Sequence, residues 1–396
     1  MASEIVKFTN WLIHPEELIC SILYLLRHSP PDEKVHKMNN TGNMTSCYNF
    51  LEQTSRSFAT VIQELHPKIR DDDMTINDVF KTELLVDFHT YLYEIGWCFN
   101  ESGPNEKDAP LLVSFSVVID EFLKIDVVYQ KVIADIAKQM GAGMAKYIKK
   151  RVNTVEDYNE YCYFVAGLVG IGLSKIFYAS GLEGIVSYFS TQLFYIQLIQ
   201  TISNIIIITL IDVLDNRRFW PTEIWSKHVN YISNLVEDKN IVKGTQCLNE
   251  MCLNALNHIP DVIEYLALIR DPTVFKFCAI PQVMAIATIT ACANNSVVLQ
   301  ENVKIRKGEA IRLIYEASDL NSCQKVFVRY LDTMLTNINK SKTDPNYDNL
   351  VRTITTLRKN INARTRYNII DYTTRTTVAL SFFATIIYFI LSLISR

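Results

Sequence analysis

The sequence predicts an all-α protein built as a single helical bundle. Only 12 glycines and 11 prolines occur in 396 residues, which is few for the many tight turns of a β fold. Apolar residues recur at helical spacing, as in Phe50, Phe58, Val61, Ile62 and Leu65. A later segment has Pro260 near its start and Asp271-Pro272 at its stop, which are helix boundary signals.

Composition narrows the class of protein further. A chain of 396 residues can bury a large core, as one big domain or as two ordinary ones. The formal net charge of −3 gives no basic footprint for nucleic acid, so we expect no nucleic-acid partner. The nine cysteines include no CxxC pair and no histidine at zinc spacing, which favours a reducing compartment.

The first 77 residues carry two helical patterns and an acidic cluster. Residues 11–27 predict a helix, a polar loop follows, and residues 47–65 predict a second helix. Inside the second helix stands the trio Ser55, Arg56 and Ser57, which on an ordinary surface helix is a solvated polar face. Asp71 to Asp73 come next, and such a triplet can be an N-cap cluster for the following helix.

The middle of the chain is expected to be helical over 78–150, with a Gly/Pro break between Glu101 and Pro110. The stretch Tyr161–Phe177 then carries three glycines within six residues. Each glycine costs a helix about 1 kcal/mol relative to alanine, so something must approach this backbone closely. Two interpretations stay open. Gly167, Gly170 and Gly172 either allow tight helix–helix packing or form a smooth wall for a long hydrocarbon ligand, with Tyr161 and Tyr163 as polar handles.

Two further segments combine apolar residues with features that need a reason. Phe194–Leu214 holds no charged residue before Asp212, and a hydropathy scan alone would flag it as a membrane span. Several glutamines and hydroxyl residues dilute it, so we expect it inside the bundle. Phe277 begins an apolar run that contains Pro281 and Gln282, which are unusual in a featureless core helix. Taken alone, Phe277 reads as a core phenylalanine.

The end of the chain predicts a membrane anchor. Thr377–Ile394 runs without a charge, and at about 1.5 Å per residue it spans close to 30 Å of hydrocarbon. The preceding segment is basic, with arginine or lysine at positions 352, 358, 359, 364, 366 and 375. This flank should stay in the cytosol by the positive-inside bias.

Seven stretches of the chain, in order, are similar to motifs of the squalene synthase family, whose members join two farnesyl diphosphates head to head. They are HPEEL near the start, LEQTSRSFATVIQEL, YCYFVAGLVGIGLSKIF, RFWPTEIW, CLNEMCLNALNHIPDVIEYL, FCAIPQVMAIATI and VKIRKGEA. The resemblance covers nearly the whole chain. It implies a single prenyl-synthase-type bundle, facing the cytosol from the endoplasmic reticulum membrane, that is monomeric.

The resemblance also implies a reaction and the residues that serve it. Mg²⁺ helps ionise one farnesyl diphosphate, the second traps the cation as presqualene diphosphate, and NADPH then gives squalene. Tyr161 matches the catalytic tyrosine, and Phe277 matches the aromatic residue of the second step. Diphosphate is implied at Ser55, Arg56 and Ser57, where the planar fork of arginine suits phosphate oxygens. NADPH phosphates are implied at Arg56, Lys304 and Arg306, and Mg²⁺ at Asp71, Asp72 and Asp212.

Both aspartate-rich motifs depart from the family pattern. The first lacks its leading aspartate, because Arg70 passes directly into Asp71 and roughly four to five turns of helix are missing. Counting back from Phe219-Trp220-Pro221 places Ile207 at an expected arginine and Ile208 at the first aspartate of the second motif. Two functions therefore stay open: a working squalene synthase whose sequence lacks a segment here through splicing or a gene-model error, or a non-catalytic anchored relative that binds isoprenoid or protein partners.

The expected organisation has three parts. Residues 1–340 form the helical domain, residues 341–376 form a basic polar linker, and residues 377–394 form the transmembrane tail anchor.

Overall fold

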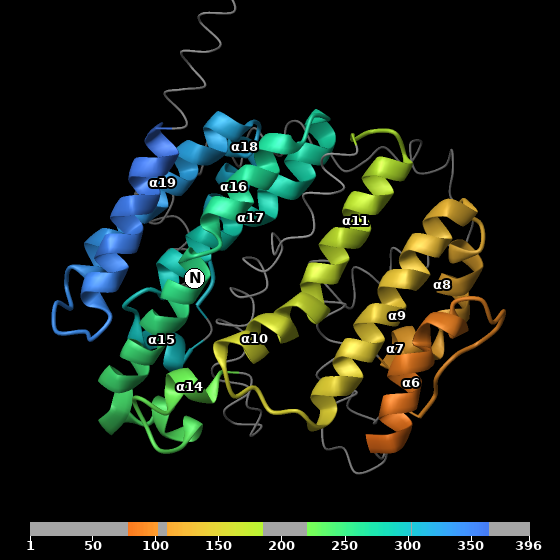
Figure 1. Cartoon of the computed structure of the whole chain (residues 1–396), viewed down its shortest axis with the longest axis horizontal. Coiled ribbons are helices and arrows are strands. Elements are labelled where there is room, and N and C mark those ends of the chain that lie inside the picture. The colour runs from red at the N-terminus through yellow and green to blue at the C-terminus, as the bar shows by residue number, and fades with distance from the viewer. Residues whose placement is uncertain (1–77, 102–108, 185–219, 302, 364–396) are drawn as a thin grey trace, which may run out of the picture.

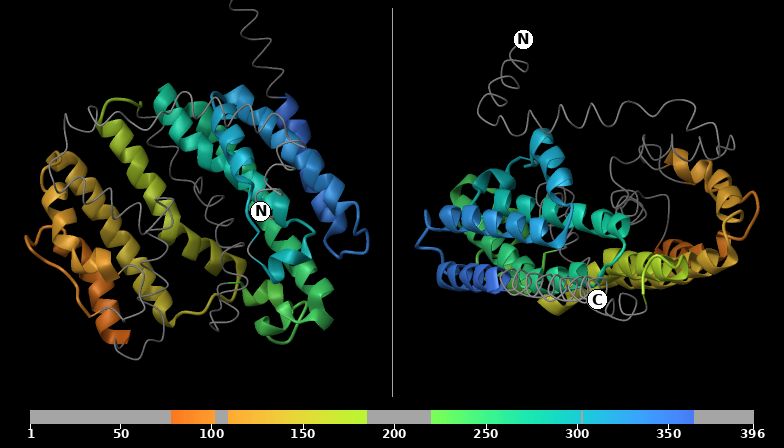
Figure 2. Two further views of the ribbon diagram at one scale, coloured as in Figure 1. Left: turned by 180° about the vertical axis from the view of Figure 1, so that it is seen from behind. Right: turned by 90° about the horizontal axis from the view of Figure 1, so that it is seen from above.

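The computed structural model describes residues 78–101, 109–184, 220–301 and 303–363. Within these ranges every regular element is a helix and no strand occurs, which confirms the predicted all-α class. The helices form two groups, and the long helical stretch from α10 to α11 lies between them (Figure 1). The views from behind and from above show the same arrangement (Figure 2).

The first group contains α6 (Asp78–Tyr91), α7 (Ala109–Val113), α8 (Phe115–Phe122) and α9 (Val127–Lys149). The α9 helix confirms the expected long helix in this region. It starts at Asp126, whose side chain accepts a hydrogen bond from the backbone N–H of Val128 at 2.9 Å. A small core is buried beneath this group, made of Leu92, Leu111, Phe115, Ile119 and Phe122.

The middle stretch consists of α10 (Val155–Cys162), a π-helical turn η1 (Tyr163–Gly167) and α11 (Leu168–Ala179). It ends in a turn at residues 180–183, where Gly181 has a φ of +76° that favours glycine.

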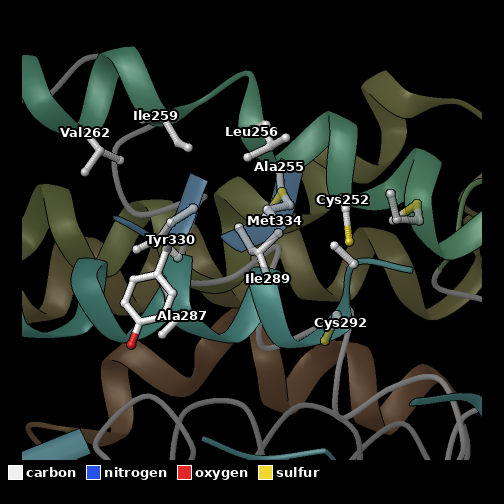
Figure 3. Packing of buried hydrophobic residues seen from close by; sticks show 14 of the residues in the cluster. Cys252, Ala255, Leu256, Ile259, Val262, Ala287, Ile289, Cys292, Tyr330 and Met334 are labelled. Atoms are coloured by element: carbon white, nitrogen blue, oxygen red, sulfur yellow. The ribbon is translucent and has the colours of Figure 1, made fainter. Parts of the chain in front are cut away.

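The second group holds the largest core. It contains α14 (Thr222–Trp225), the 3₁₀ turns η2 (Ile232–Val236) and η3 (Asp238–Asn240), and α15 (Ile241–Leu256). It continues through α16 (Ile259–Leu268), α17 (Pro272–Cys292), the 3₁₀ turn η4 (Ser296–Leu299), α18 (Lys307–Glu316) and α19 (Leu320–Ile338). Figure 3 shows Cys252 and Leu256, Ile289 and Cys292, and Met334 meeting in this core from α15, α17 and α19.

The expected linker at 341–376 requires a correction. Residues 347–363 form a further helix, which packs on the large core through four buried side chains: Leu350, Ile354, Leu357 and Ile361. These follow one another at intervals of four, three and four residues, the repeat of one helix face. The basic residues of this segment had suggested a linker, but the buried face makes it part of the bundle up to residue 363.

Two of the described helical stretches are long and apolar enough to cross a membrane by length and composition, Val155–Ala179 and Pro272–Cys292. About half of each is buried inside the bundle, so both serve as core helices here. The predicted tail anchor, Thr377–Ile394, lies outside the described residues, as does Phe194–Leu214.

Candidate active site

The stretch that joins the two groups of helices begins with a capping box. The side chain of Thr154 accepts a hydrogen bond from the backbone N–H of Asp157 at 3.0 Å, and the Asp157 carboxylate accepts one from the backbone N–H of Thr154 at 3.1 Å. The helix then runs unbroken from Val155 to Ala179. Its π-helical turn comes directly after Tyr161 and Cys162. Such turns hold one extra residue and are frequent at functional sites.

An apolar cavity of about 260 Å³ lies between α6, α9 and α11. None of its lining side chains is polar, so it offers a bound molecule no side-chain hydrogen bond, and hydrocarbon is the chemistry that suits it. The lining residues are Leu85 and Phe88 from α6, Val132, Ile133, Ile136, Ala137, Met140, Gly141 and Met144 from α9, and Val169, Gly172, Leu173 and Ile176 from α11.

Of the three glycines whose role the sequence left open, Gly172 lines this cavity, whereas Gly167 and Gly170 do not. A Cβ atom on Gly141 would stand 1.9 Å from the backbone oxygen of Leu85, and one on Gly143 would stand 2.1 Å from the ring of Phe164. These glycines therefore allow helices to pack closely. Gly172 lines the cavity, and a Cβ there would stand 2.9 Å from Cγ1 of Ile136. On α11, close packing and a hydrocarbon wall thus meet at one residue.

Tyr161 lies at the end of α10 and is 4% exposed. Its ring packs edge to face on Tyr147, with centroids 5.3 Å apart. Tyr161 is not among the residues that line the α6–α9–α11 cavity. The structure therefore separates it from Gly172, although we expected Tyr161 and the glycine wall to border the same space.

A charged network surrounds the neighbour of Tyr161. The hydroxyl of Tyr147 lies 2.7 Å from the backbone oxygen of Asp157 and 2.8 Å from Oε2 of Glu160. Glu160 also accepts from Lys146 at 2.5 Å and from Lys150 at 2.9 Å. The hydrogen bond from Lys146 is the main reason that the pKa of Glu160 is lowered to about 2. Burial, and then the Glu160 carboxylate, raise the pKa of Tyr147, so its hydroxyl stays protonated at neutral pH.

A chain of polar side chains connects α11 to the second group of helices. The hydroxyl of Tyr265 on α16 lies 3.1 Å from Oγ of Ser174 on α11 and 3.7 Å from Sγ of Cys278 on α17. Burial raises the pKa of Tyr265, and it raises the pKa of the Cys278 thiol to about 11. All three groups are therefore neutral, and they fix the spacing of three helices inside an apolar interior.

Phe277 is adjacent to this chain and is not a core residue. It is 54% exposed, and its ring meets Phe177 edge to face with centroids 6.0 Å apart. The simple interpretation of Phe277 as core packing is therefore wrong, and an aromatic face remains open to a ligand. Five residues further along α17, Gln282 is 3% exposed. Its Oε1 has no hydrogen-bond partner in the part of the chain that the structure describes.

Lys304 and Arg306 are both exposed, in the segment that leads into α18. Arg306 precedes the first residue of that helix, and its Nη2 lies 3.6 Å from Oε2 of Glu309. Lys307 follows at the start of α18, where the positive end of the helix dipole adds to the basic charge. These groups could bind an anionic ligand from solvent.

The remaining predicted site residues lie outside the described ranges: Ser55, Arg56, Ser57, Asp71, Asp72 and Asp212. Within 78–101, 109–184, 220–301 and 303–363, no group of three or more histidine, cysteine, aspartate or glutamate side chains could hold a metal ion.

Sequence reasoning missed two polar features of this region. The Tyr147–Glu160 network could have been found from charge spacing, because Lys146 and Lys150 stand four apart near the end of one helix. The contact of Ser174 with Tyr265 spans 91 positions of sequence and leaves no local signal.

The sequence is similar to known proteins over most of its length. A family model of squalene/phytoene synthases matches residues 69–309. The chain is 39% identical to human squalene synthase over 373 positions, which include 89% of this chain and 88% of that protein. It is 40% identical to squalene synthase ERG9 of Candida albicans over 368 positions, with 86% and 82% covered.

The fold is also similar to a solved structure. A TcSQS complex with the ligand E5700 superposes with a TM-score of 0.75 at 31% identity, covering 82% of this chain and 99% of that one.

Proposed function

The chain belongs to the squalene/phytoene synthase family and is a squalene-synthase-like enzyme, and we propose that it converts farnesyl diphosphate to squalene slowly. The reaction we assign is the condensation of two farnesyl diphosphates to presqualene diphosphate, followed by reduction with NADPH. The observation that carries this proposal is the all-apolar cavity between α6, α9 and α11, in a chain that is 39% identical to a squalene synthase over most of its length.

The cavity supports a site for the farnesyl chain. Its volume of about 260 Å³ is at the small end for a ligand pocket, which suits one hydrocarbon tail better than two. Gly172 keeps the wall of α11 free of side chains, while Met140 and Met144 can adapt to the shape of the ligand. A second tail would need space bordered by residues beyond this cavity.

We place the diphosphate end of the substrate at Ser55, Arg56 and Ser57, with Mg²⁺ at Asp71, Asp72 and Asp212. Carboxylates are suitable donors, and Mg²⁺ is commonly held by one or two of them together with phosphate and water. Bound Mg²⁺ would neutralise charge on the departing diphosphate. Ile207 and Ile208 carry no ligand atoms, so this donor set is thinner than the one the family pattern supplies.

Tyr161 is our candidate for the catalytic tyrosine. Its buried position against the ring of Tyr147 supports this role, because the Tyr161 side chain is held away from bulk water. Phe277 is our candidate for the second step, in which its open aromatic face would stabilise a cation electrostatically. NADPH would supply a hydride, and Lys304 and Arg306 would contact its phosphates as exposed cations.

A segment missing from the chain, relative to its relatives, supports the proposal of slow turnover. The 373 positions compared with the human enzyme include 89% of 396 residues, which is about 350, so about twenty positions are gaps in this chain. That total is close to the roughly four to five turns of helix missing after Arg70. Ile207 and Ile208 also favour a second function, an isoprenoid-binding relative without turnover.

The tail supports a membrane location. Because Thr377–Ile394 is free of charge and follows a basic segment, we propose a single C-terminal anchor with the bundle on the cytosolic side of the endoplasmic reticulum.

A product assay tests the assigned function. The chain ending at residue 376 would be incubated with farnesyl diphosphate and Mg²⁺, with and without NADPH, and the extract separated. We expect a small amount of squalene with NADPH, and presqualene diphosphate without it. Tyr161→Phe is the control, because it keeps the ring contact with Tyr147 and removes only the hydroxyl. Farnesyl diphosphate binding with no product above this control would support the non-catalytic function.

A further inference from the structure

Five exposed apolar residues gather where two loops of the first helical group meet. Tyr93 is 45% exposed and Ile95 81%, in the loop after α6, while Ile125 is 37%, Val127 57% and Val128 53% exposed where α8 leads into α9. We name these five residues the apolar corner. The two loops are in contact, because the rings of Tyr93 and Phe122 meet edge to face at 5.3 Å.

The apolar corner is held in a fixed shape. The side chain of Gln130 donates to the backbone oxygens of Leu123 at 3.2 Å and Ile125 at 2.8 Å. Asp126 caps the first turn of α9 through the N–H of Val128. These bonds hold the loop so that its apolar side chains face outward. A built surface with clustered apolar side chains is typical of a contact site rather than of scattered surface residues.

The charges around the apolar corner leave it close to neutral. Lys124 pairs with Glu121 at 2.7 Å, and the Asp126 carboxylate keeps its negative charge while it caps the positive N-terminal end of α9. The exposed Glu94 and Lys131 carry opposite charges. The apolar corner therefore offers little electrostatic attraction to a charged partner. A lipid surface, which has an apolar interior and zwitterionic headgroups, matches it better.

The end of the described chain indicates what this surface faces. In Figure 1 the junction of α8 with α9 and the end of the helix 347–363 (deep blue) both lie toward the upper side of the bundle, at opposite ends of its longest axis, and the view from behind in Figure 2 shows the same. The charge-free stretch Thr377–Ile394 begins 14 residues after Ala363. An extended chain of that length reaches up to about 45–50 Å. A bilayer that holds the stretch can therefore lie across this upper side of the bundle.

We propose that the apolar corner rests on the surface of the same lipid bilayer that holds the C-terminal stretch, and inserts into its interfacial layer. Apolar side chains gain free energy when they leave water for the acyl boundary, and a tyrosine prefers that interface. This inference rests on the proposed tail anchor. It adds an orientation, in which the start of α9 faces the membrane and α14 faces away from it.

Lipid quenching of tryptophan fluorescence tests the orientation. Ile95→Trp and Val128→Trp would each be made in the full-length chain and reconstituted in phosphatidylcholine vesicles with brominated acyl chains. Tyr231→Trp is the matched control, because Tyr231 is 68% exposed and directly precedes η2, in the segment that follows α14, and α14 lies on the lower side of the bundle in Figure 1. We expect bromine to quench the added fluorescence of both corner variants at least about twofold more than that of the control, unchanged by high salt.

The other outcomes overturn the proposal in distinguishable ways. Vesicle flotation without extra quenching at Ile95 and Val128 overturns the orientation and leaves the anchor intact. A chain that does not float overturns both proposals. Equal quenching at all three positions also overturns the proposed orientation. If the chain ending at residue 376 is a dimer that Ile95→Asp separates, the apolar corner binds a second copy instead.

Discussion

Adding a methyl group to either of two cavity glycines should have opposite consequences for folding and for binding. At Gly141 a new Cβ would stand 1.9 Å from the backbone oxygen of Leu85, so α6 and α9 must separate by roughly 1 Å. Overpacking against fixed atoms costs about 1–3 kcal/mol, and a glycine-to-alanine change in a helix returns about 1 kcal/mol at most. Gly141→Ala should therefore lower the free energy of unfolding by about 1–2 kcal/mol.

At Gly172 the same change meets a side chain that can move. The new Cβ would stand 2.9 Å from Cγ1 of Ile136, and Ile136 faces the cavity, where it has room to shift. The strain and the gain in helix propensity nearly cancel, so Gly172→Ala should stay within about 1 kcal/mol of the parent. Because the methyl group occupies the hydrocarbon wall, it should weaken the binding of farnesyl diphosphate severalfold.

The assay is urea unfolding of the chain ending at residue 376, followed by titration of each variant with farnesyl diphosphate. The reasoning fails if Gly141→Ala is as stable as the parent, because the close approach of α6 and α9 would then not exist in solution. It also fails if Gly172→Ala binds farnesyl diphosphate as tightly as the parent, because the ligand would then lie elsewhere.

Three further predictions concern polar contacts and the tail. Tyr265→Phe should cost about 1–2 kcal/mol of unfolding free energy by stranding the buried Ser174 hydroxyl. The double variant with Ser174→Ala should lose less than the sum of the two single variants, and additive losses would contradict the contact. The pKa of Glu160 is lowered from 4.5 to about 2, so its contribution is complete above pH 4.5 and is lost as the pH falls toward 2. Since Glu160 is about one-third exposed, we expect about 1 kcal/mol, and Glu160→Gln should flatten the unfolding profile in that range. An unchanged profile would show that the lysines do not hold this carboxylate. Ending the chain before Thr376 should move the protein to the soluble fraction in a folded state, and sedimentation with membranes in high salt would contradict the tail anchor.

Local signals predicted much of the helical layout. The proline and aspartate boundaries at Pro260 and Asp271 mark the start of α16 and the cap of α17. The helix 347–363 was missed although Leu350, Ile354, Leu357 and Ile361 repeat at helical spacing, because the basic residues between them outweighed that pattern in our interpretation. Arg352 and Lys359 are exposed on the outer face of this helix, and Arg358 pairs with Asp332 of α19.

The candidate site was predictable only in part, because its parts come together through tertiary packing. The glycines of α11 indicated that another group packs closely against this helix. The sequence did not indicate that Ile136 of α9 and Leu85 of α6 would line the cavity beside it. The solvent exposure of Phe277 was not predictable either. The sequence pattern indicates a core residue, but the side chain is about half exposed and packs beside Phe177. A contact such as Ser174 with Tyr265 depends on the final crossing of two helices and has no local signature.

We propose that this member of the squalene synthase family turns over slowly, because both motifs proposed to bind Mg²⁺ lack their leading aspartate. Metal bridging of the leaving diphosphate is worth several kcal/mol, and each 1.36 kcal/mol is a factor of ten in rate. Loss of one bridging ion should therefore slow ionisation by about a thousandfold or more. A typical enzyme turns over at about 10 s⁻¹, so we expect about 0.01 s⁻¹ or less.

Pyrophosphate release by the chain ending at residue 376, with farnesyl diphosphate, Mg²⁺ and NADPH, tests this claim most directly. We predict very slow release from the unmodified sequence and no rescue by Ile208→Asp alone, since the segment missing after Arg70 would also carry ligands and core side chains. Restoring both features should bring turnover back. Ordinary turnover by the unmodified chain would contradict the account and show that Asp72 and Asp212 suffice.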